Sequence, residues 1–216
     1  MSDLENLFDS HTHNFDTKNR GIVQLSQSSV GNLPAYFSFG IHPKENEADL
    51  LEIAEICEEL SLKSGFLAIG EIGLDNRYDN FPEQEERYIF QLKLAAKFNK
   101  PVILHCVNSW DRCRFLHEKN APETTLIYHG FNKASIVEPV LDYPKSIISI
   151  GESILSNQQL QKVIEQIPLD RLLLETDTGE GELIETYRIV AEIKSLSLHA
   201  LIKQLDQNAK RIFNYE

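Results

Sequence analysis

The chain of 216 residues is 42% hydrophobic and 25% charged, which argues against a disordered or fibrous protein and suits one hydrophobic core, so we expect a single domain over residues 1–216. No apolar run reaches the roughly 20 residues of a membrane helix, and the acidic segment Met1–Asn6 is unlike a signal peptide, which predicts a cytoplasmic protein without membrane association. The net charge of −12 argues against a broad basic surface for duplex nucleic acid, although bound metal ions can supply local positive charge to a nuclease.

Short apolar runs rich in β-branched residues recur along the chain and are typical of buried strands. In chain order, the predicted strands are Leu7–His13, Gly21–Gln27, Ala35–His42, Phe66–Asp75, Pro101–Cys106, Thr125–Gly130, Ser146–Gly151 and Arg171–Asp177. Eight parallel strands close a barrel of the TIM type, so this number favours a (β/α)₈ fold.

Amphipathic patterns between the later strands, and after the last one, predict helices. In chain order, the predicted helices are Ala48–Leu62, Glu83–Phe98, Trp110–Lys119, Ser135–Leu141, Asn157–Gln166, Glu182–Ser195 and Leu198–Phe213. Strands that alternate with helices pair in parallel, which indicates the α/β class.

The first two connections differ from the later ones. Residues Asn14–Arg20 and Ser28–Pro34 are too short for a helix that covers a strand, so we expect the first two connecting helices to be missing or very short. The flank of the first three strands would then be apolar and uncovered. Because such a patch tends to bury itself, the sequence predicts a homo-oligomer formed through that flank.

Candidate metal ligands fall at the C-terminal ends of several predicted strands, where barrel enzymes build their active sites. Imidazoles and carboxylates that converge suit a divalent cation such as zinc, manganese or magnesium. His11 and His13 lie two residues apart, so on a strand they point to the same face. That pair alone is weak evidence, and the prediction depends on the whole set, which is His11, His13, Glu71, His105, His129 and Asp177.

Carboxylates of this set suggest the catalytic roles. Glu71 can give one oxygen to each of two cations roughly 3.5–4 Å apart, and its strand contains no lysine or arginine that could pair with a buried glutamate. Asp177 would bind one cation and accept the proton of the attacking water. Glu175 falls on the same predicted strand face, one layer deeper, which favours a structural or ligand-supporting role.

Other side chains near the same strand ends have more than one interpretation. Asp75 can accept the second ring proton of a ligand histidine or cap the following turn, and Arg77 can bind a substrate phosphate or remain solvated. His42 ends the third strand, and we expect it to contact substrate rather than metal. His117 and His199 lie in helical stretches, and we expect both at the surface.

The motifs that carry these residues resemble the TatD family of metal-dependent deoxyribonucleases, within the amidohydrolase superfamily, nearly end to end. The opening Asp9–His13 is similar to that family's H-x-H motif, and the other matching segments are Phe39–Pro43, Ala68–Asp75, Pro101–His105, His129–Phe131 and Leu173–Asp177. The resemblance implies two divalent metal ions on the six ligands named above. Related amidohydrolases have a carboxylated lysine where Glu71 stands, so the glutamate favours the TatD-like branch.

The departures from the family pattern lie outside the ligands. The family continues after its last ligand with a proline and a longer loop that carries basic residues, whereas this chain has the acidic segment Thr178–Glu182. Asn132 stands where the family often has serine. The acidic segment would repel a polyanion, so the chemistry is better predicted than the substrate.

The resemblance implies a hydrolase that cleaves phosphodiester bonds, such as those at a 3′ end of single-stranded DNA, with a metal-activated water. A second interpretation is an enzyme of the same superfamily that acts on a small phosphoester, amide or lactone. A third, from another class, is a barrel without useful activity that serves as a binding module.

Overall fold

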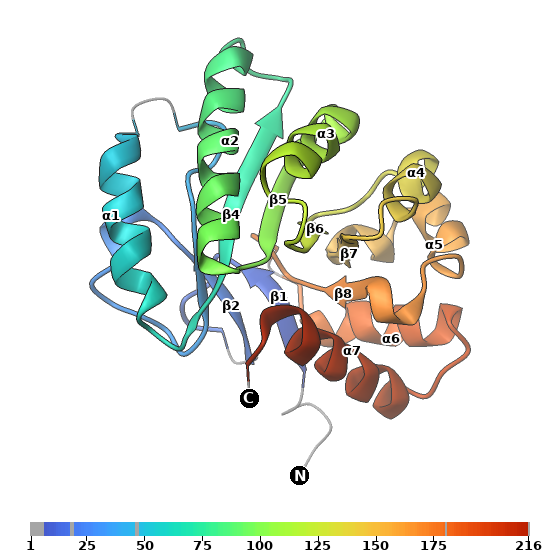
Figure 1. The fold of residues 1–216 in the computed structure, drawn as a ribbon. Coiled ribbons are helices and arrows are strands. Elements are labelled where there is room, and N and C mark those ends of the chain that lie inside the picture. The colour runs from blue at the N-terminus through green and yellow to red at the C-terminus, as the bar shows by residue number, and fades with distance from the viewer. Residues whose placement is uncertain (1–6, 18–19, 46–47, 180, 216) are drawn as a thin grey trace. The chain divides into compact units, whose positions relative to one another are not determined.

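The computed structural model describes residues 7–17, 20–45, 48–179 and 181–215 (Figure 1). The chain divides into two compact units, one of residues 1–23 and 129–216 and the other of residues 24–128. The expectation of a single domain remains a prediction. None of the described helices combines the length and hydropathy that a bilayer crossing requires.

The unit of residues 24–128 contains a parallel sheet in the order β3–β4–β5–β6. Its strands are β3 (Phe37–Phe39), β4 (Phe66–Asp75), β5 (Val102–Val107) and β6 (Leu126–Tyr128). The pairs Phe39↔Ile69, Gly73↔His105 and Leu104↔Tyr128 give the register. Helices α1 (Leu50–Ser61), α2 (Phe81–Phe98) and α3 (Trp110–Asn120) connect these strands in turn, as βαβ units require.

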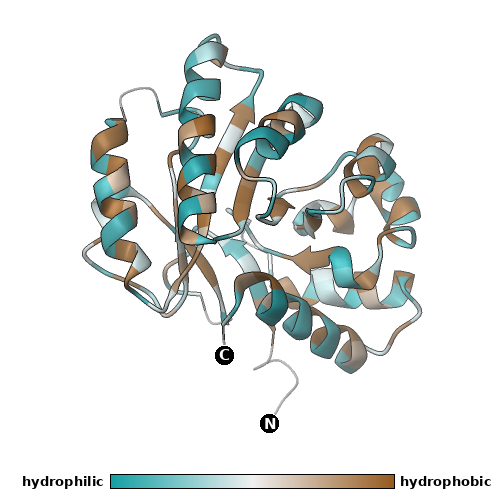
Figure 2. Cartoon of the chain, viewed as in Figure 1, coloured by the Kyte–Doolittle hydropathy of each residue, from teal (hydrophilic) through white to brown (hydrophobic). Residues whose placement is uncertain are grey.

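Helix α2 illustrates how the sequence defines an element of this unit. Pro82 occupies its first turn, where a missing N–H costs no hydrogen bond, and Asn99 ends it in the left-handed conformation with φ 50°. Tyr88, Leu92 and Ala95 recur at helical spacing and form a buried face that packs on β4. Figure 2 shows this division, with hydrophobic colouring along β4 and mixed colouring around α2.

The unit of residues 1–23 and 129–216 contains a second parallel arrangement of strands. Its strands are β1 (Phe8–Thr12), the first part of β2 (Arg20–Leu25), β7 (Ser146–Ile150) and β8 (Leu172–Leu174). β7 pairs with β8, β1 pairs with β2, and the bridge Thr12↔Asp177 joins the segment after β8 to β1. The helices are α4 (Val137–Leu141), α5 (Gln158–Ile164), α6 (Leu183–Ile193) and α7 (Leu198–Phe213).

Two polar side chains attach the last helices to this sheet. The Tyr187 hydroxyl of α6 donates to the Phe8 carbonyl at 2.9 Å and accepts from the Phe8 amide at 3.4 Å. Asn208 of α7 donates to the Leu172 carbonyl at 2.9 Å. Both side chains are buried, so these bonds satisfy strand groups that water does not reach.

The predicted elements are all present in the described residues, in the predicted order. Among the described residues, the first two connections contain no α-helix, and their only helical turn is the 3₁₀ segment Gln27–Ser29. This confirms that the covering helices are missing or very short. The largest difference is at β3, which covers Phe37–Phe39 rather than Ala35–His42. Strand β8 ends at Leu174 rather than at Asp177, which has a left-handed φ of 54°.

The expectation that His117 lies at the surface was wrong. Its side chain is fully buried in α3, and Nε2 lies 2.9 Å from Thr124 Oγ1. The reason is helical geometry, because His117 follows the buried Cys113 by four residues and therefore shares its inward face. His199 is exposed, as expected.

Tyr187→Phe should lower the free energy of unfolding by about 1–3 kcal/mol, because both backbone groups of Phe8 lose a buried partner. Urea unfolding followed by circular dichroism would measure it. Tyr78→Phe is the matched control, since Tyr78 is 40% exposed and should change stability by no more than about 0.5 kcal/mol. Equal effects of the two substitutions would contradict the role given to Tyr187.

Candidate metal-binding clusters

In the unit of residues 24–128, three predicted site residues converge. Glu71 lies within β4, His105 lies within β5, and His42 follows β3. Glu71 Oε1 lies 2.6 Å from His105 Nδ1 and 3.5 Å from His42 Nε2. The two histidine nitrogens lie 3.2 Å apart. One donor atom of each residue lies within 4.8 Å of the others, so the group is compact enough to bind one cation. His42, which we expected to contact substrate, is therefore also within reach of a cation bound here.

The backbone of β4 positions the acid of this group against its neighbour on β5. Gly73 pairs with His105 and has a φ of 150°. A Cβ atom at Gly73 would lie 1.9 Å from the His105 carbonyl oxygen, so only glycine permits this close approach. Glu71 precedes Gly73 by two residues and is 4% exposed.

Asp75 holds the other side of the His105 ring. Its Oδ2 lies 3.0 Å from His105 Nε2, and Arg77 donates to the same carboxylate from Nε at 2.8 Å and from Nη2 at 2.5 Å. Burial would raise the pKa of Asp75, but the hydrogen bonds from Arg77 and His105 outweigh it and lower the pKa below its ordinary value. The carboxylate therefore stays ionised and can orient the ring. Because the Arg77 guanidinium already binds Asp75, its contact with a substrate phosphate remains a prediction.

In the unit of residues 1–23 and 129–216, the other predicted ligands form a second cluster. His11 Nε2 and His13 Nε2 each lie 3.5 Å from Asp177 Oδ1, and the ring centroids of His11 and His129 are 4.6 Å apart. Donor atoms of His11, His129 and Asp177 lie within 4.8 Å of one another. His11 is buried, whereas the Asp177 side chain is 35% exposed and open to solvent.

Asp177 reaches this cluster from the segment after β8, where it forms an isolated bridge with Thr12 of β1. Its amide donates to the His11 carbonyl, and its carbonyl accepts from the His13 amide, both at 3.0 Å. With φ at 54°, the residue does not follow the alternation of strand side chains. Our argument that Asp177 and Glu175 share a strand face was therefore wrong, although Glu175 does lie deeper, at 1% exposed.

Glu175 faces neutral donors rather than a basic side chain. Its Oε1 accepts from the Gly130 amide at 2.5 Å and lies 3.4 Å from His129 Nδ1, and its Oε2 accepts from the Ser149 hydroxyl. Ser149 in turn lies 2.7 Å from the Ser10 hydroxyl. Sequence reasoning missed both serines, because their contact joins residues 139 positions apart.

Asp9 is a further buried acid that the sequence analysis gave no role. It has no exposed surface, and both of its oxygens accept hydrogen bonds from Thr176. Burial raises the pKa of Asp9 to about 7, although the hydrogen bonds from Thr176 act in the opposite direction. Asp9 precedes His11 by two residues in the opening motif, a position that could have drawn attention to it.

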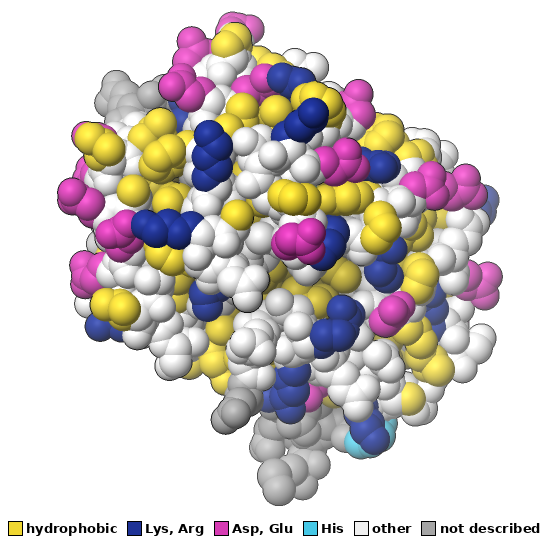
Figure 3. Space-filling view, viewed as in Figure 1, with side chains coloured by type: hydrophobic (Ala, Val, Ile, Leu, Met, Phe, Trp, Pro, Cys, Tyr) yellow, Lys and Arg dark blue, Asp and Glu magenta, His cyan; other side chains and the backbone are white. Residues whose placement is uncertain are grey.

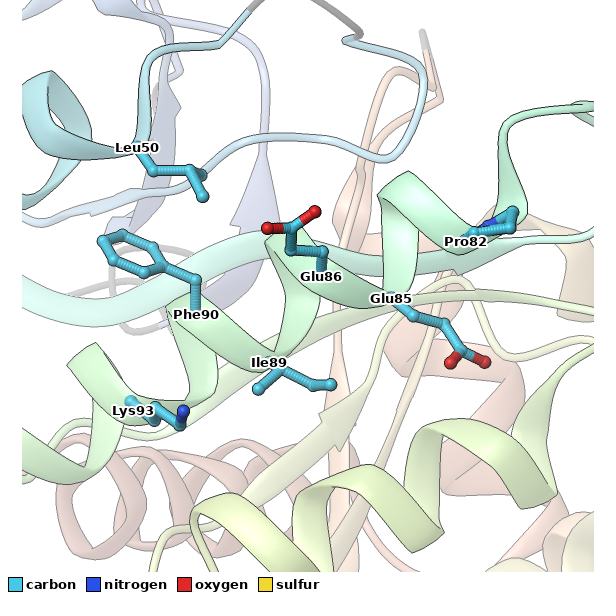
Figure 4. A pocket seen from close by; sticks show the side chains of 7 residues that line it. All are labelled: Leu50, Pro82, Glu85, Glu86, Ile89, Phe90 and Lys93. Carbon is cyan, nitrogen blue, oxygen red and sulfur yellow. The ribbon is translucent and has the colours of Figure 1, made fainter.

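A hollow of about 430 Å³ lies elsewhere, on the outward side of α2 beside the first residue of α1. It is lined by Leu50, Pro82, Glu85, Glu86, Ile89, Phe90 and Lys93 (Figure 4). Figure 3 shows hydrophobic side chains mixed with charged ones over these two helices. None of the lining residues is a predicted ligand, so this hollow is separate from both clusters.

Comparisons with known proteins show the family to which the chain is similar. The sequence profile of the family described as TatD related DNase matches residues 8–214. The metal-dependent hydrolase YabD of Bacillus subtilis is 29% identical over 200 residues, which cover 82% of this chain and 77% of YabD. The 3′-5′ ssDNA/RNA exonuclease TatD of Pantoea ananatis is 28% identical over 197 residues, which cover 81% of this chain and 76% of that enzyme.

A solved structure resembles the chain over its whole length. YjjV, a TatD homologue of Escherichia coli, matches with a TM-score of 0.81 at 24% identity, and the match covers 99% of this chain and 100% of YjjV. This likeness confirms the predicted fold class, an α/β fold of the TIM-barrel type.

Asp75→Asn should weaken the binding of Mn²⁺ about 10- to 100-fold, because the amide no longer holds the His105 ring as an ionised carboxylate does. Isothermal titration calorimetry would measure the dissociation constant. Asp79→Asn removes the same charge from an exposed position in the same turn and should leave the affinity nearly unchanged. An unaltered affinity in Asp75→Asn would show that Asp75 does not support a ligand.

Proposed function

Because the chain belongs to the family of TatD-related DNases, we propose that it is a metal-dependent hydrolase that cleaves phosphodiester bonds in single-stranded DNA. The observation that carries the proposal is the grouping of the predicted site residues, which form one compact set of histidine and carboxylate donors in each unit. Neutral imidazoles with one ionised acid are the donors that borderline divalent cations prefer.

We propose that His11, His13, Glu71, His105, His129 and Asp177 bind two divalent metal ions. Zinc, manganese and magnesium all suit these donors, and the choice among them is open. A bound divalent cation would polarise a phosphoryl oxygen and acidify the water that attacks it. That Glu71 gives an oxygen to each of two cations remains a prediction.

The protein's own side chains then supply orientation and a proton acceptor. The Asp177 carboxylate is partly open to solvent, so it can accept the proton of the attacking water. Asp75 faces the second nitrogen of His105, and Glu175 faces a nitrogen of His129. A histidine whose other nitrogen meets a carboxylate is fixed in ring orientation and is a better ligand.

Single-stranded DNA is the proposed substrate because a relative that acts on it, the TatD exonuclease of Pantoea ananatis, is similar over most of this chain. His42 and Arg77 are the proposed substrate contacts. The net charge of −12 and the acidic segment Thr178–Glu182 favour a second candidate, hydrolysis of a small phosphoester, amide or lactone. Self-association through the flank of the first three strands and a cytoplasmic location remain predictions.

Asp177→Asn should lower turnover about 10²- to 10⁴-fold, because an amide cannot accept the proton of the attacking water. Glu71→Gln should abolish most activity together with bound metal. Steady-state kinetics, metal analysis and thermal melting would be measured for each variant. Asp142→Asn is the control, since it makes the same change at an exposed position of the same unit as Asp177. Near-normal turnover in either site variant would remove that residue from the mechanism.

The substrate proposal predicts that purified protein, loaded with Mn²⁺ or Mg²⁺, shortens labelled single-stranded DNA and that a chelator stops the reaction. A panel of small phosphoesters, amides and lactones would be assayed beside the DNA. Rapid turnover of a small ester without any DNA product would replace the nuclease proposal with the second candidate. Protein that neither binds metal nor turns over any substrate would instead support the binding-module interpretation.

A further inference from the structure

The buried carboxylate of Asp9 accepts its two shorter hydrogen bonds from one neighbour, Thr176, and a longer one from the His11 amide at 3.4 Å. The Thr176 amide donates to Asp9 Oδ1 at 3.0 Å, and the Thr176 hydroxyl donates to Asp9 Oδ2 at 2.7 Å. A carboxylate with no exposed surface that accepts two bonds from a single residue holds that residue in both position and rotamer. Asp9 therefore fixes the segment that leaves β8.

Thr176 directly precedes Asp177, whose backbone has an unfavourable conformation. A φ of 54° places Asp177 in the left-handed region, which costs energy for a residue with a Cβ atom, although aspartate enters it more readily than most residues do. The two backbone bonds of Asp177 to β1 help to restrain it in this conformation. The bonds between Asp9 and Thr176 add to this restraint, because they hold the residue before Asp177 by both its amide and its side chain.

Thr12 extends this network to the other end of β1. Its Oγ1 lies 2.9 Å from Thr176 Oγ1 and accepts from the Asn14 amide at 3.2 Å. The Thr12 hydroxyl also donates to the Asp177 carbonyl at 3.5 Å, so the contacts of Thr12 reach Asp177 as well as Thr176. Thr176 is thus held between two residues of the strand that also carries His11.

The neighbouring strand leaves room for the Asp9 side chain. A Cβ atom at Gly21 would lie 2.5 Å from Asp9 Cβ and 2.6 Å from the Asp9 carbonyl oxygen, distances that no real Cβ contact allows. Glycine at position 21 of β2 therefore leaves the space that the Asp9 side chain and backbone occupy.

We propose that Asp9 and Thr176 are positioning residues that hold the Asp177 carboxylate beside His11 and His13. This inference rests on the proposed function, in which Asp177 is a metal ligand and proton acceptor. It assigns no chemical step to Asp9 or Thr176, which act through Asp177 alone.

The test is a double-substitution cycle on the full chain, read by Mn²⁺ affinity as well as by activity. Thr176→Val keeps the side-chain shape but removes the hydroxyl, and we expect it to weaken Mn²⁺ binding about 10-fold and to lower kcat with little change in KM. Thr176→Ser, which restores the hydroxyl, should recover both values. In the Asp177→Asn background, Thr176→Val should have no further effect on Mn²⁺ binding.

Control substitutions separate positioning from a general loss of stability. Thr186→Val makes the same change at a buried position of α6 and should alter the melting temperature without altering Mn²⁺ affinity. Wild-type affinity in Thr176→Val, or equal losses with and without Asp177, would overturn the proposal. If Thr176→Val does not fold, Asp9→Asn takes its place in the same cycle, and failure of both to fold would show a purely structural role.

The affinity measurement keeps this inference distinct from the proposed function. A wild-type protein that binds Mn²⁺ but hydrolyses no substrate would refute the proposed activity. The substitution cycle would still test whether Asp9 and Thr176 position Asp177. If the protein hydrolyses DNA but Thr176→Val leaves its metal affinity unchanged, only the positioning role of Asp9 and Thr176 would be refuted.

Discussion

Buried carboxylates on parallel strands, or directly after them, are the constraint on which the candidate site depends. Glu71, Asp9 and Glu175 are each less than 5% exposed, and the described contacts pair them with imidazoles, hydroxyls and amides rather than with lysine or arginine. Burying an ionised acid in this way is costly unless hydrogen bonds or a cation compensate. Buried acids are tolerated on these strands because polar groups of neighbouring segments form hydrogen bonds with them. The same acids and their neighbouring histidines form groups that can bind a metal ion.

In both clusters a carboxylate faces the ring of a histidine and is itself held by hydrogen-bond donors, although the residues differ. In one, Asp75 faces the ring of His105 and is itself held by Arg77. In the other, Glu175 faces the ring of His129 and is held by the Gly130 amide and Ser149. A charged partner lowers the pKa of Asp75, so its negative charge is secure, whereas Glu175 accepts hydrogen bonds from an amide and a hydroxyl. Each arrangement limits the rotation of a histidine before any ligand binds, which reduces the entropy lost on binding.

Much of the fold could be predicted from the sequence because strand and helix periodicities are local. The bounds of β4 and α7 agree with the prediction residue for residue, and glycine or asparagine at element ends explains where the chain turns. The ligands were predictable for a related reason, since barrel sites use strand ends. The end of β8 was not, because the left-handed conformation of Asp177 is imposed by β1, which is more than 160 residues away in the chain. The burial of His117 likewise depends on the face that α3 turns inward.

The supporting network was beyond sequence reasoning for the same physical cause. Ser10, Ser149 and Thr176 are ordinary small polar residues whose importance arises only when distant segments meet, as in the bond between Thr176 and Asp9. The candidate ligands could be predicted from the sequence more fully than the substrate could. The candidate ligands and their supporting acids lie on strands or in the segments that directly follow them, where contacts between distant parts of the chain fix their side chains. The acidic residues of Thr178–Glu182 follow the last candidate ligand in the sequence and are not candidate ligands themselves, so a substitution there changes the local charge without removing a metal donor.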